Sequence, residues 1–550
     1  MSEHEHTTKS NKPLAIAIVI VILAYLICAI PHPNLSLPQK GAEMIATENE
    51  HGHAAHDEGS HEPGTAHHES EGEGHGATDE PLSEEVHKID EKLAKEGITV
   101  EEGPAYGKDK KKLTPPPFWT VIPFVLLLGA IAVLPLIPAT EHWWESNKSR
   151  FLVAAGLGLI TLLYYLFFHH YPIDGHFPVH TTAAPGAGGP NWAISLTVLS
   201  NAFLAEYIPF IILLFALYTI SGGIRISGDL KAHALTNTTF IAIGGLLASF
   251  IGTTGAAMLL IRPLLETNKE RKHVVHTVVF FIFVVCNCGG CLLPIGDPPL
   301  FLGYLRGVPF EWTFNLWIEW AFLNGVLIGL YFILDHFIYH PKELPLDVAL
   351  DETRTTGLKI EGLFPNIILL VGVILAVALL DPHKTIGGWR PWVFMREIVQ
   401  LLMVLLSLVF GSQMVRIKNR FNYHAILEVA ALFIGIFICM QPALQILNIY
   451  GPDLGLNSPM KFFWATGSLS SVLDNAPTYV VFFDTAQSLP SMEGVKYVGD
   501  TGVPEHLLIG ISLGAVFMGA MTYIGNGPNF MVKAIAEKSG VKMPSFFGYM

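Results

Sequence analysis

Charge is what this sequence has least of. Asp, Glu, Lys and Arg make up 15% of its 550 residues, whereas a soluble protein averages about 25%. Apolar runs of 18 or more residues recur along the chain, and each is long enough to cross a bilayer. This composition excludes an ordinary soluble fold. It predicts an all-α polytopic membrane protein in contact with the lipid bilayer, with no nucleic-acid partner.

Cysteine is also scarce. The five cysteines, all within apolar segments, are Cys28, Cys286, Cys288, Cys291 and Cys439. They do not form the pattern of an extracellular disulfide framework. Three of them make a C-x-C-x-x-C pattern without nearby partner ligands, for which we expect a packing role. No cofactor and no resident metal is expected.

The first 117 residues differ from the rest. Residues 14–30 are apolar, and we interpret them as an uncleaved anchor helix. Residues 31–117 hold 19 Asp and Glu against 8 Lys, a net charge of −11, and we expect a disordered extracytoplasmic loop. A solvated tether is the favoured interpretation of its histidines; the alternative is weak metal binding by His51, His53, His56, His61, His67 and His68.

Residues 118–550 are predicted to be the transporter domain. With a cytoplasmic N-terminus, the positive-inside rule yields ordinary spans at 118–138, 151–168, 193–220, 313–335, 362–380, 394–415 and 424–448. Residues 235–262 are apolar, yet basic residues flank both ends. A re-entrant hairpin with Gly252–Gly255 at its tip explains this pattern. A second hairpin is expected at 460–489, where Leu473–Thr478 forms the tip and the flanking loops belong outside.

Two further segments are predicted to be interrupted helices, 274–305 and 506–536. The first contains Cys286–Pro299, in which glycines, prolines and Asp297 occur inside an apolar run. The second is broken at Gly525–Pro528. Irregular backbone at membrane depth is tolerated only where it is buried in protein or lines a cavity. An intramembrane carboxylate such as Asp297 is therefore a functional-site hypothesis.

The order of these elements repeats. Glu206 precedes the first hairpin tip by 47 residues, and Glu428 precedes the second by 46. An interrupted helix follows each hairpin, and the inferred orientations are opposite. We therefore predict two inverted repeats, at about 190–335 and about 362–550, with the binding site at their interface. The final stretch, Phe546–Met550, resembles the lead-in to another span.

Hard cations prefer oxygen ligands, which the polar residues of the interruptions supply. The four interruptions hold no arginine or lysine, which speaks against an anionic substrate, although helix N-termini bind carboxylates unaided. The candidate ion- or substrate-binding residues are Asp297, Asp474, Asn475, Thr253, Thr254, Asn287, Gly296, Asn526, Asn529, Glu206 and Glu428.

These motifs resemble the ion transporter superfamily. Asn287-x-Gly-Gly-x-x-x-Pro-Ile-Gly-Asp297 is similar to the broken-helix signature of NhaD-type sodium/proton antiporters and their citrate-transporter relatives, and Leu473-Asp-Asn-Ala-Pro477 to the second-hairpin signature. The resemblance covers roughly 190–550. It implies Na⁺ (or Li⁺)/H⁺ exchange across the cell inner membrane, with Asp474, Asn475 and Asp297 near the ion. The antiporters carry Asp-Asn in the first hairpin too, where this chain has Thr253-Thr254.

We therefore predict a sodium/proton antiporter that works by alternating access. The alternative is a Na⁺- or H⁺-coupled carrier of a small di- or tricarboxylate such as citrate, which the hydroxyl tip of the first hairpin favours. An intramembrane aspartyl protease is disfavoured because Asp297 lacks the first glycine of a Gly-x-Gly-Asp motif; no enzyme is expected. A channel explains the paired interruptions less well. The oligomeric state stays open, with a homodimer among the alternatives.

Overall fold

The computed structural model describes residues 11–29, 98–99 and 115–550, apart from 176, 178–180, 187, 383, 385–387, 492–493 and 500. The predicted anchor helix is present as α1 (Lys12–Ala29). It packs against α16 (Met395–Phe410), and its Tyr25 hydroxyl donates to the Val393 carbonyl oxygen at 2.8 Å. The histidines of the predicted metal-binding alternative lie outside the described residues.

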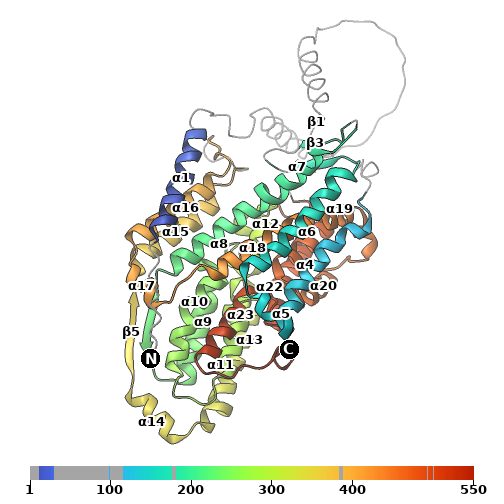
Figure 1. The fold of residues 1–550 in the computed structure, drawn as a ribbon. Coiled ribbons are helices and arrows are strands. Elements are labelled where there is room, and N and C mark those ends of the chain that lie inside the picture. Colours follow the sequence, from blue (N-terminus) through green and yellow to red (C-terminus); the bar gives the residue numbers. More distant parts are fainter. Residues whose placement is uncertain are drawn as a thin grey trace, which may run out of the picture.

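The chain forms a mostly helical bundle (Figure 1). Its first part consists of η3 (Phe118–Val121), α4 (Ile122–Val133), η4 (Leu134–Leu136), α5 (Pro138–Trp144), α6 (Asn147–Phe167), α7 (Trp192–Ser200), the π-helix η5 (Asn201–Tyr207) and α8 (Ile208–Ser221). The central helices outside the hairpins and broken helices are η7 (Phe310–Leu316), α13 (Trp317–Leu334), η8 (Asp335–Tyr339), η9 (His340–Lys342), α14 (Pro345–Thr353), α15 (Leu363–Leu379) and α17 (Gln413–Lys418). Three helices precede the second hairpin: α18 (His424–Cys439), α19 (Gln441–Tyr450) and η10 (Gly451–Leu454).

Among the residues that the structure describes, five helices are long and apolar enough to cross a membrane: Phe118–Leu136, Asn147–Phe167, Trp192–Ser221, Ala234–Ile251 and Phe310–Lys342. A sixth candidate is the pair His424–Cys439 and Gln441–Leu454, which is bent by 42°. The sequence predicts one straight span there; the bend follows from Pro442, which lacks the N–H group that would continue the helix. These spans support a multi-pass membrane protein.

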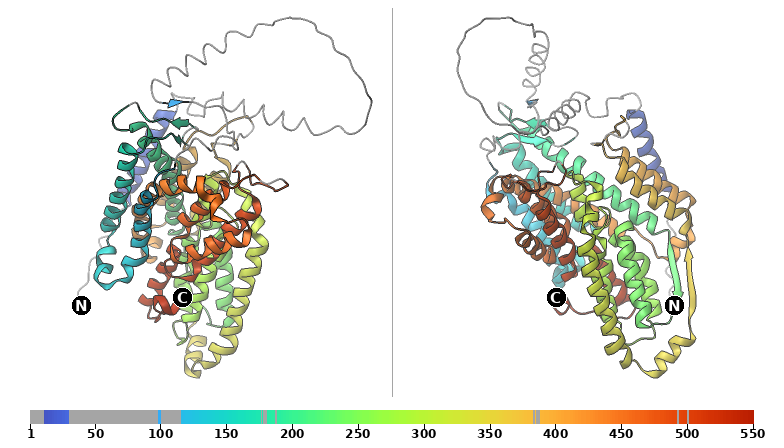
Figure 2. Two further views of the ribbon diagram at one scale, coloured as in Figure 1. Left: turned by 90° about the vertical axis from the view of Figure 1, so that its right-hand side faces the viewer. Right: turned by 180° about the vertical axis from the view of Figure 1, so that it is seen from behind.

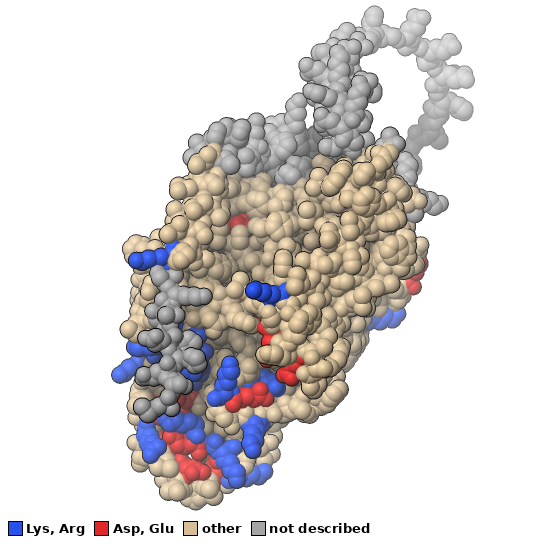
Figure 3. Space-filling model, in the orientation of Figure 1, with Lys and Arg blue, Asp and Glu red and all other residues tan. Residues whose placement is uncertain are grey.

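The surface has the distribution of polar groups expected for such a protein. Large apolar side chains are exposed along the spans; Phe322 on α13, for example, is 72% exposed. In Figure 3, charged side chains gather at the lower end of the molecule, the end at which α14 lies in Figure 1, and the surface above is largely uncharged. A face of this kind is suited to lipid.

The first predicted hairpin is built from α9 (Ala234–Ile251) and α10 (Thr253–Thr267), which pack against each other. They are separated by Gly252 alone, whose φ of 79° is one that glycine adopts without strain. At the opposite end the amides of Asn237 and Asn268 form two reciprocal hydrogen bonds of 2.8 Å. Because Asn237 begins the first helix and Asn268 follows the second, these bonds close the base of an antiparallel pair.

The second predicted hairpin consists of α20 (Pro459–Val472) and α21 (Asn475–Gln487), with Leu473 and Asp474 between them. The two helices are in contact. Asp474 is the N-cap of α21, and its Oδ1 atom accepts a hydrogen bond of 3.0 Å from the Ala476 amide. The aspartate at the predicted tip therefore satisfies one of the free N–H groups at the start of this helix.

Both predicted broken helices are interrupted. The first comprises α11 (Val275–Val285), the short η6 (Cys288–Cys291) and α12 (Pro298–Leu305). The second comprises α22 (Glu505–Met518), η11 (Gly519–Met521) and α23 (Gly527–Lys538). Its interruption begins at Gly519, six residues before the predicted one. Gly519 lies within 4 Å of Asn287 and Gly525, so close packing there leaves little room for a side chain.

Short strands join loops that the sequence patterns leave unassigned. β4 (Arg225–Asp229) and β5 (Thr356–Glu361) form an antiparallel pair although about 130 residues separate them. A smaller sheet has the order β1-β3-β2 and contains β1 (Ile98–Thr99), β2 (Ile173–Gly175) and β3 (Thr181–Ala183). The last helix, α24 (Phe546–Tyr549), folds back so that the Tyr549 hydroxyl donates to the Ala520 carbonyl oxygen at 3.0 Å. Figure 2 shows the whole bundle in two further views.

Candidate functional site

Four helix N-termini meet at Asp297. This residue is the N-cap of α12, and its carboxylate accepts hydrogen bonds from the first residue of α10, the first residue of α21 and the N-cap of α23. The donors are the Thr253 hydroxyl at 3.1 Å, the Asn475 amide at 2.8 Å and the Asn526 amide at 3.0 Å. Both hairpins and both broken helices therefore contribute to one buried group, which we call the Asp297 cluster (Thr253, Asp297, Asn475 and Asn526).

A second layer of amides supports this cluster. The side chain of Asn287 donates to Asn529 at 2.7 Å, and Asn529 in turn donates to the carbonyl oxygens of Gly519 and Thr522 at 2.8 and 2.9 Å. Asn526 also donates to the Cys286 carbonyl oxygen at 2.9 Å. Asn526 of the second broken helix thus holds the unwound segment of the first, while the carbonyl groups of the second interruption are held by Asn529 of the same helix. This arrangement supplies partners for carbonyl groups that helix breakage would leave exposed in a membrane.

The first interruption is kept compact by glycines. A Cβ atom on Gly289 would lie 2.5 Å from the Gly245 Cα atom of α9, so the two backbones approach where only glycine fits. The freed Gly289 carbonyl oxygen accepts hydrogen bonds from the Ser249 hydroxyl and from the Trp320 ring at 3.0 Å. Gly296 is buried, and its carbonyl oxygen accepts a 2.8 Å hydrogen bond from the Thr253 amide. These contacts fix the backbone that presents Asp297.

The structure brings together most of the candidate residues named from the sequence. Asp297, Thr253, Asn475, Asn526, Asn287, Asn529 and Gly296 form one connected group. Within the described residues, the Oδ1 atom of Asn475 is buried without a hydrogen-bond partner, so an acceptor oxygen stays free at the cluster. Asp474 and Thr254 are half-buried beside it. The side chains of Asp474 and Thr254 are not among the three that donate a hydrogen bond to the Asp297 carboxylate.

The two glutamates lie elsewhere. Glu206 is on η5, and its Oε1 atom accepts a 2.7 Å hydrogen bond from Arg306, the residue after α12. Glu428 is on α18 and forms an ion pair of 2.8 Å with Arg150 of α6. The structure therefore does not bring Glu428 to the Asp297 cluster, whereas Glu206 is linked to it through α12.

Sequence reasoning missed Arg306 and its second partner, Asp484 on α21. The Arg306 Nε atom lies 3.3 Å from an oxygen of Asp484. The apolar run predicted as a broken helix ends at residue 305, one residue before Arg306. The available signal was a lone arginine directly behind an apolar half-helix, because such a residue needs an acidic partner when it is buried.

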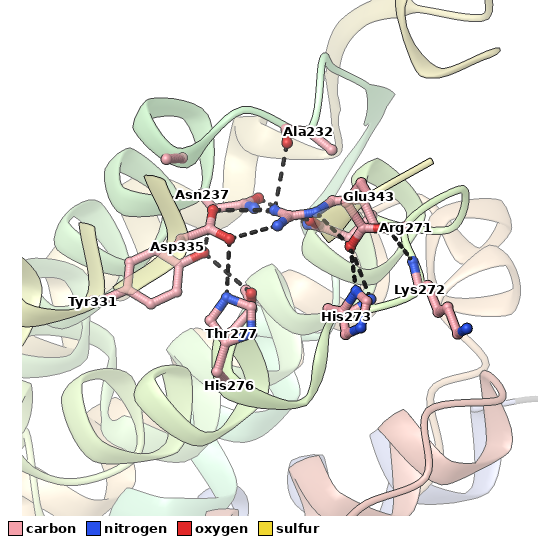
Figure 4. Close-up of polar contacts among 12 residues, drawn as sticks. Ala232, Asn237, Arg271, Lys272, His273, His276, Thr277, Tyr331, Asp335 and Glu343 are labelled. Atoms are coloured by element: carbon pink, nitrogen blue, oxygen red, sulfur yellow. Dashed lines mark hydrogen bonds and ion pairs between the residues drawn. The ribbon is translucent and has the colours of Figure 1, made fainter. Parts of the chain in front are cut away.

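A second polar cluster lies at the base of the first hairpin (Figure 4). Arg271 bonds Asp335 of η8 at 3.1 Å through Nη1 and approaches Glu343 at 3.6 Å, while His276 lies 2.9 Å from Asp335. Burial alone would raise the pKa of Glu343, but the backbone amides of Lys272 and His273 and the Arg271 guanidinium hold that pKa below its ordinary value. This cluster ties α10, α11 and α13 together at one end.

Cys286, Cys288, Cys291 and Cys439 are buried free thiols, and the first three belong to the first interruption. In the part of the chain that the structure describes, no group of three or more His, Cys, Asp or Glu side chains is arranged to hold a metal ion. The Asp297 cluster supplies a carboxylate, two amides and a hydroxyl at the helix N-termini, and the Asp474 carboxylate lies beside it. These groups can bind a small anion, a hard cation or both.

Residues 113–550 match the model of a protein family described as putative citrate transport. A search of curated proteins finds no match to the sequence.

Proposed function

Because the chain belongs to the putative citrate transport family, we propose that it is a secondary transporter that carries a small di- or tricarboxylate such as citrate together with a cation. The family membership supports a carboxylate cargo better than the Na⁺/H⁺ antiport that the sequence motifs first suggest. Antiport stays a prediction, and the carboxylate alternative becomes the main proposal.

The observation that carries this proposal is the meeting of four helix N-termini at Asp297. Each N-terminus is equivalent to about +0.5 charge, so the four together provide about +2. The carboxylates of Asp297 and Asp474 offset this charge when both are ionised. A cation bound to these aspartates would restore the positive potential, and a substrate carboxylate would then be attracted without any arginine at the cluster.

Cation coupling follows from the same charges. Carboxylate, hydroxyl and amide oxygens are the ligands that a hard cation prefers, and the free Oδ1 atom of Asn475 adds one more. We infer that Na⁺ or H⁺ binds at Asp297 and Asp474 before the carboxylate does. Joint binding would leave the loaded site closer to neutral than binding of the carboxylate alone, which lowers the cost of moving it within a membrane.

We further propose that the two halves of the domain are inverted repeats. Support comes from their parallel order, because each has a glutamate-bearing helix, a hairpin and a broken helix, and each contributes two N-termini to the cluster. The base of the first hairpin carries Lys269 and Arg271, while residues 449–459, which precede the second, hold no Lys or Arg. Under the positive-inside rule these bases belong on opposite sides of the membrane.

Uptake by the intact protein in proteoliposomes tests this function. Labelled citrate and succinate are offered under Na⁺, Li⁺ or pH gradients, and in parallel a pH dye follows proton movement after Na⁺ or Li⁺ is added. We expect saturable carboxylate uptake that requires one of the gradients. No uptake of either carboxylate, with proton release evoked by Na⁺ or Li⁺, would replace the proposal with antiport.

A further inference from the structure

A buried triad of charged side chains lies near the C-terminal ends of α12 and α21, two of the helices whose N-termini meet at the Asp297 cluster. Arg306 follows α12, Asp484 lies on α21 and Glu206 lies on η5. Arg306 bonds Glu206 at 2.7 Å through Nη2 and Asp484 at 3.3 Å through Nε. Their side chains are 14%, 13% and 18% exposed, so all three charges are largely withdrawn from the surface.

The triad is coupled to the cluster by geometry. α12 packs against α21. At the N-terminal ends of α12 and α21, Asn475 donates a hydrogen bond to Asp297. Nine residues further along each helix, Arg306 forms an ion pair with Asp484. Nine helical residues span about 13 Å. The two helices therefore form a unit closed at both ends, and Glu206 joins that unit to the span Trp192–Ser221.

The charges of the triad do not balance. Two carboxylates share one guanidinium, so the ionised group carries a net charge of −1 near the middle of a 30-residue membrane span. Among the described residues, neither the Oε2 atom of Glu206 nor the Nη1 atom of Arg306 has a hydrogen-bond partner, although both are buried. A net charge at this depth is costly. One proton on a carboxylate removes it.

We propose that Glu206 is the site of the proton that this transporter moves together with its carboxylate substrate. This inference rests on the proposed function and adds a proton site at Glu206 to the cation site at Asp297 and Asp474. Protonation of Glu206 leaves a neutral Arg306–Asp484 pair and weakens the contact that ties the α12–α21 unit to η5. Deprotonation restores the contact. The proton thereby controls whether that unit can move relative to the Trp192–Ser221 span, and movement of this kind is what alternating access requires.

The surroundings single out Glu206 within the triad. The charged groups that face it are Arg306, directly after α12, and Asp484 on α21. On α18, the Phe437 ring and the Ala430 carbonyl oxygen contact the neighbouring Tyr207 of η5. Glu206 also lies in a π-helix, an irregularity that is frequent at functional sites. Its free carboxylate oxygen is the atom on which the proton resides.

The test compares two modes of transport in proteoliposomes. Counterflow of labelled citrate at equal pH reports binding and translocation, while accumulation driven by an acid-outside pH gradient reports coupling. For Glu206→Gln we expect counterflow to persist and pH-driven accumulation to be lost. The control is Glu361→Gln, which neutralises a glutamate paired with Lys418 at 2.8 Å on β5, outside the spans, and should retain both.

Asp484→Asn provides a second variant if Glu206→Gln fails to insert. It leaves a neutral Glu206–Arg306 pair, and the same loss of pH-driven accumulation with preserved counterflow is expected. The inference is overturned if Glu206→Gln still accumulates citrate on a pH gradient, if the intact protein responds only to Na⁺, or if correctly inserted variants lose counterflow as well. Absence of citrate counterflow in the intact protein would instead overturn the proposed function, and this inference with it.

Discussion

Asn475 donates a hydrogen bond of 2.8 Å to Asp297 across 178 residues of sequence. The bond joins the tip of the second hairpin to the first broken helix, so each half of the domain contributes one partner. Any movement that separates these elements must exchange the bond for another. A substrate or cation that supplies the replacement contact would control the movement, which is how binding can be linked to transport.

The Thr253 hydroxyl should contribute to substrate binding through its 3.1 Å bond to Asp297. Hydrogen bonds to charged groups contribute about 1.5–3 kcal/mol, so Thr253→Ala should weaken apparent citrate affinity by about 10- to 100-fold. Thr253→Ser keeps the hydroxyl and should stay close to the intact protein. Concentration dependence of citrate counterflow measures both. Equal affinities for the two variants would remove the hydroxyl from the site.

Asp474 should act as more than a helix cap. Asn caps a helix about as well as Asp, so Asp474→Asn should retain the thermal stability of the intact protein while losing a negative charge beside the cluster. We expect citrate uptake by this variant to require a higher concentration of the driving cation. Uptake is titrated with Na⁺ and with pH. A cation dependence identical to that of the intact protein would leave Asp474 with the capping role alone.

The amide pair at the base of the first hairpin should stabilise the fold. Both Asn237 and Asn268 are buried, so Asn268→Ala leaves the Asn237 amide without its reciprocal partner. A buried amide deprived of its partner costs about 1–3 kcal/mol. The midpoint of thermal unfolding in detergent should fall accordingly. Asn457→Ala, in the exposed loop before α20, is the control and should change it little. An unchanged midpoint for Asn268→Ala would contradict an anchoring role.

Acid should weaken the polar cluster at the base of the first hairpin. The pKa of Glu343 lies below its ordinary value of 4.5 because the folded chain favours the ionised form. A group of this kind contributes stability above its unfolded-state pKa, and that contribution is lost as the pH falls through its folded-state pKa. The intact protein should therefore unfold at a higher temperature than Glu343→Gln at neutral pH. The difference should shrink below pH 4.5; a difference that grew with acid would reverse the assigned sign.

The sequence predicted those parts of the fold and of the candidate site that leave a local pattern in it. Gly252, Asp297 and Asp474 interrupt apolar runs, and such interruptions mark the hairpin tips and broken helices directly. The bond between Asn475 and Asp297 follows from that pattern once the interruptions are assumed to meet. The position of the second break was harder to predict: α22 ends at Met518, before the Gly525–Pro528 motif that marks the interruption in the sequence.

For contacts between segments far apart in the chain, the sequence gave no signal that identifies the partners. The Arg306 triad unites three elements whose partners lie 100 and 178 residues away, and nothing near Arg306 in the sequence indicates either. The pairing of β4 with β5 is similar, since short edge strands outside a membrane have no strong hydrophobic period. Glu206 and Glu428 precede their hairpin tips by nearly the same number of residues, so the sequence did not distinguish their roles. Their different basic partners, Arg306 and Arg150, are visible only in three dimensions.

Citrate counterflow by the intact protein and by Asp297→Asn tests the central claim most directly. An asparagine at 297 would present an amide to the three donors that now converge on the carboxylate. The account predicts saturable counterflow by the intact protein and by Asp453→Asn, an exposed control, and none by Asp297→Asn. Equal counterflow by all three proteins would show that citrate passes without the Asp297 cluster and would contradict the account.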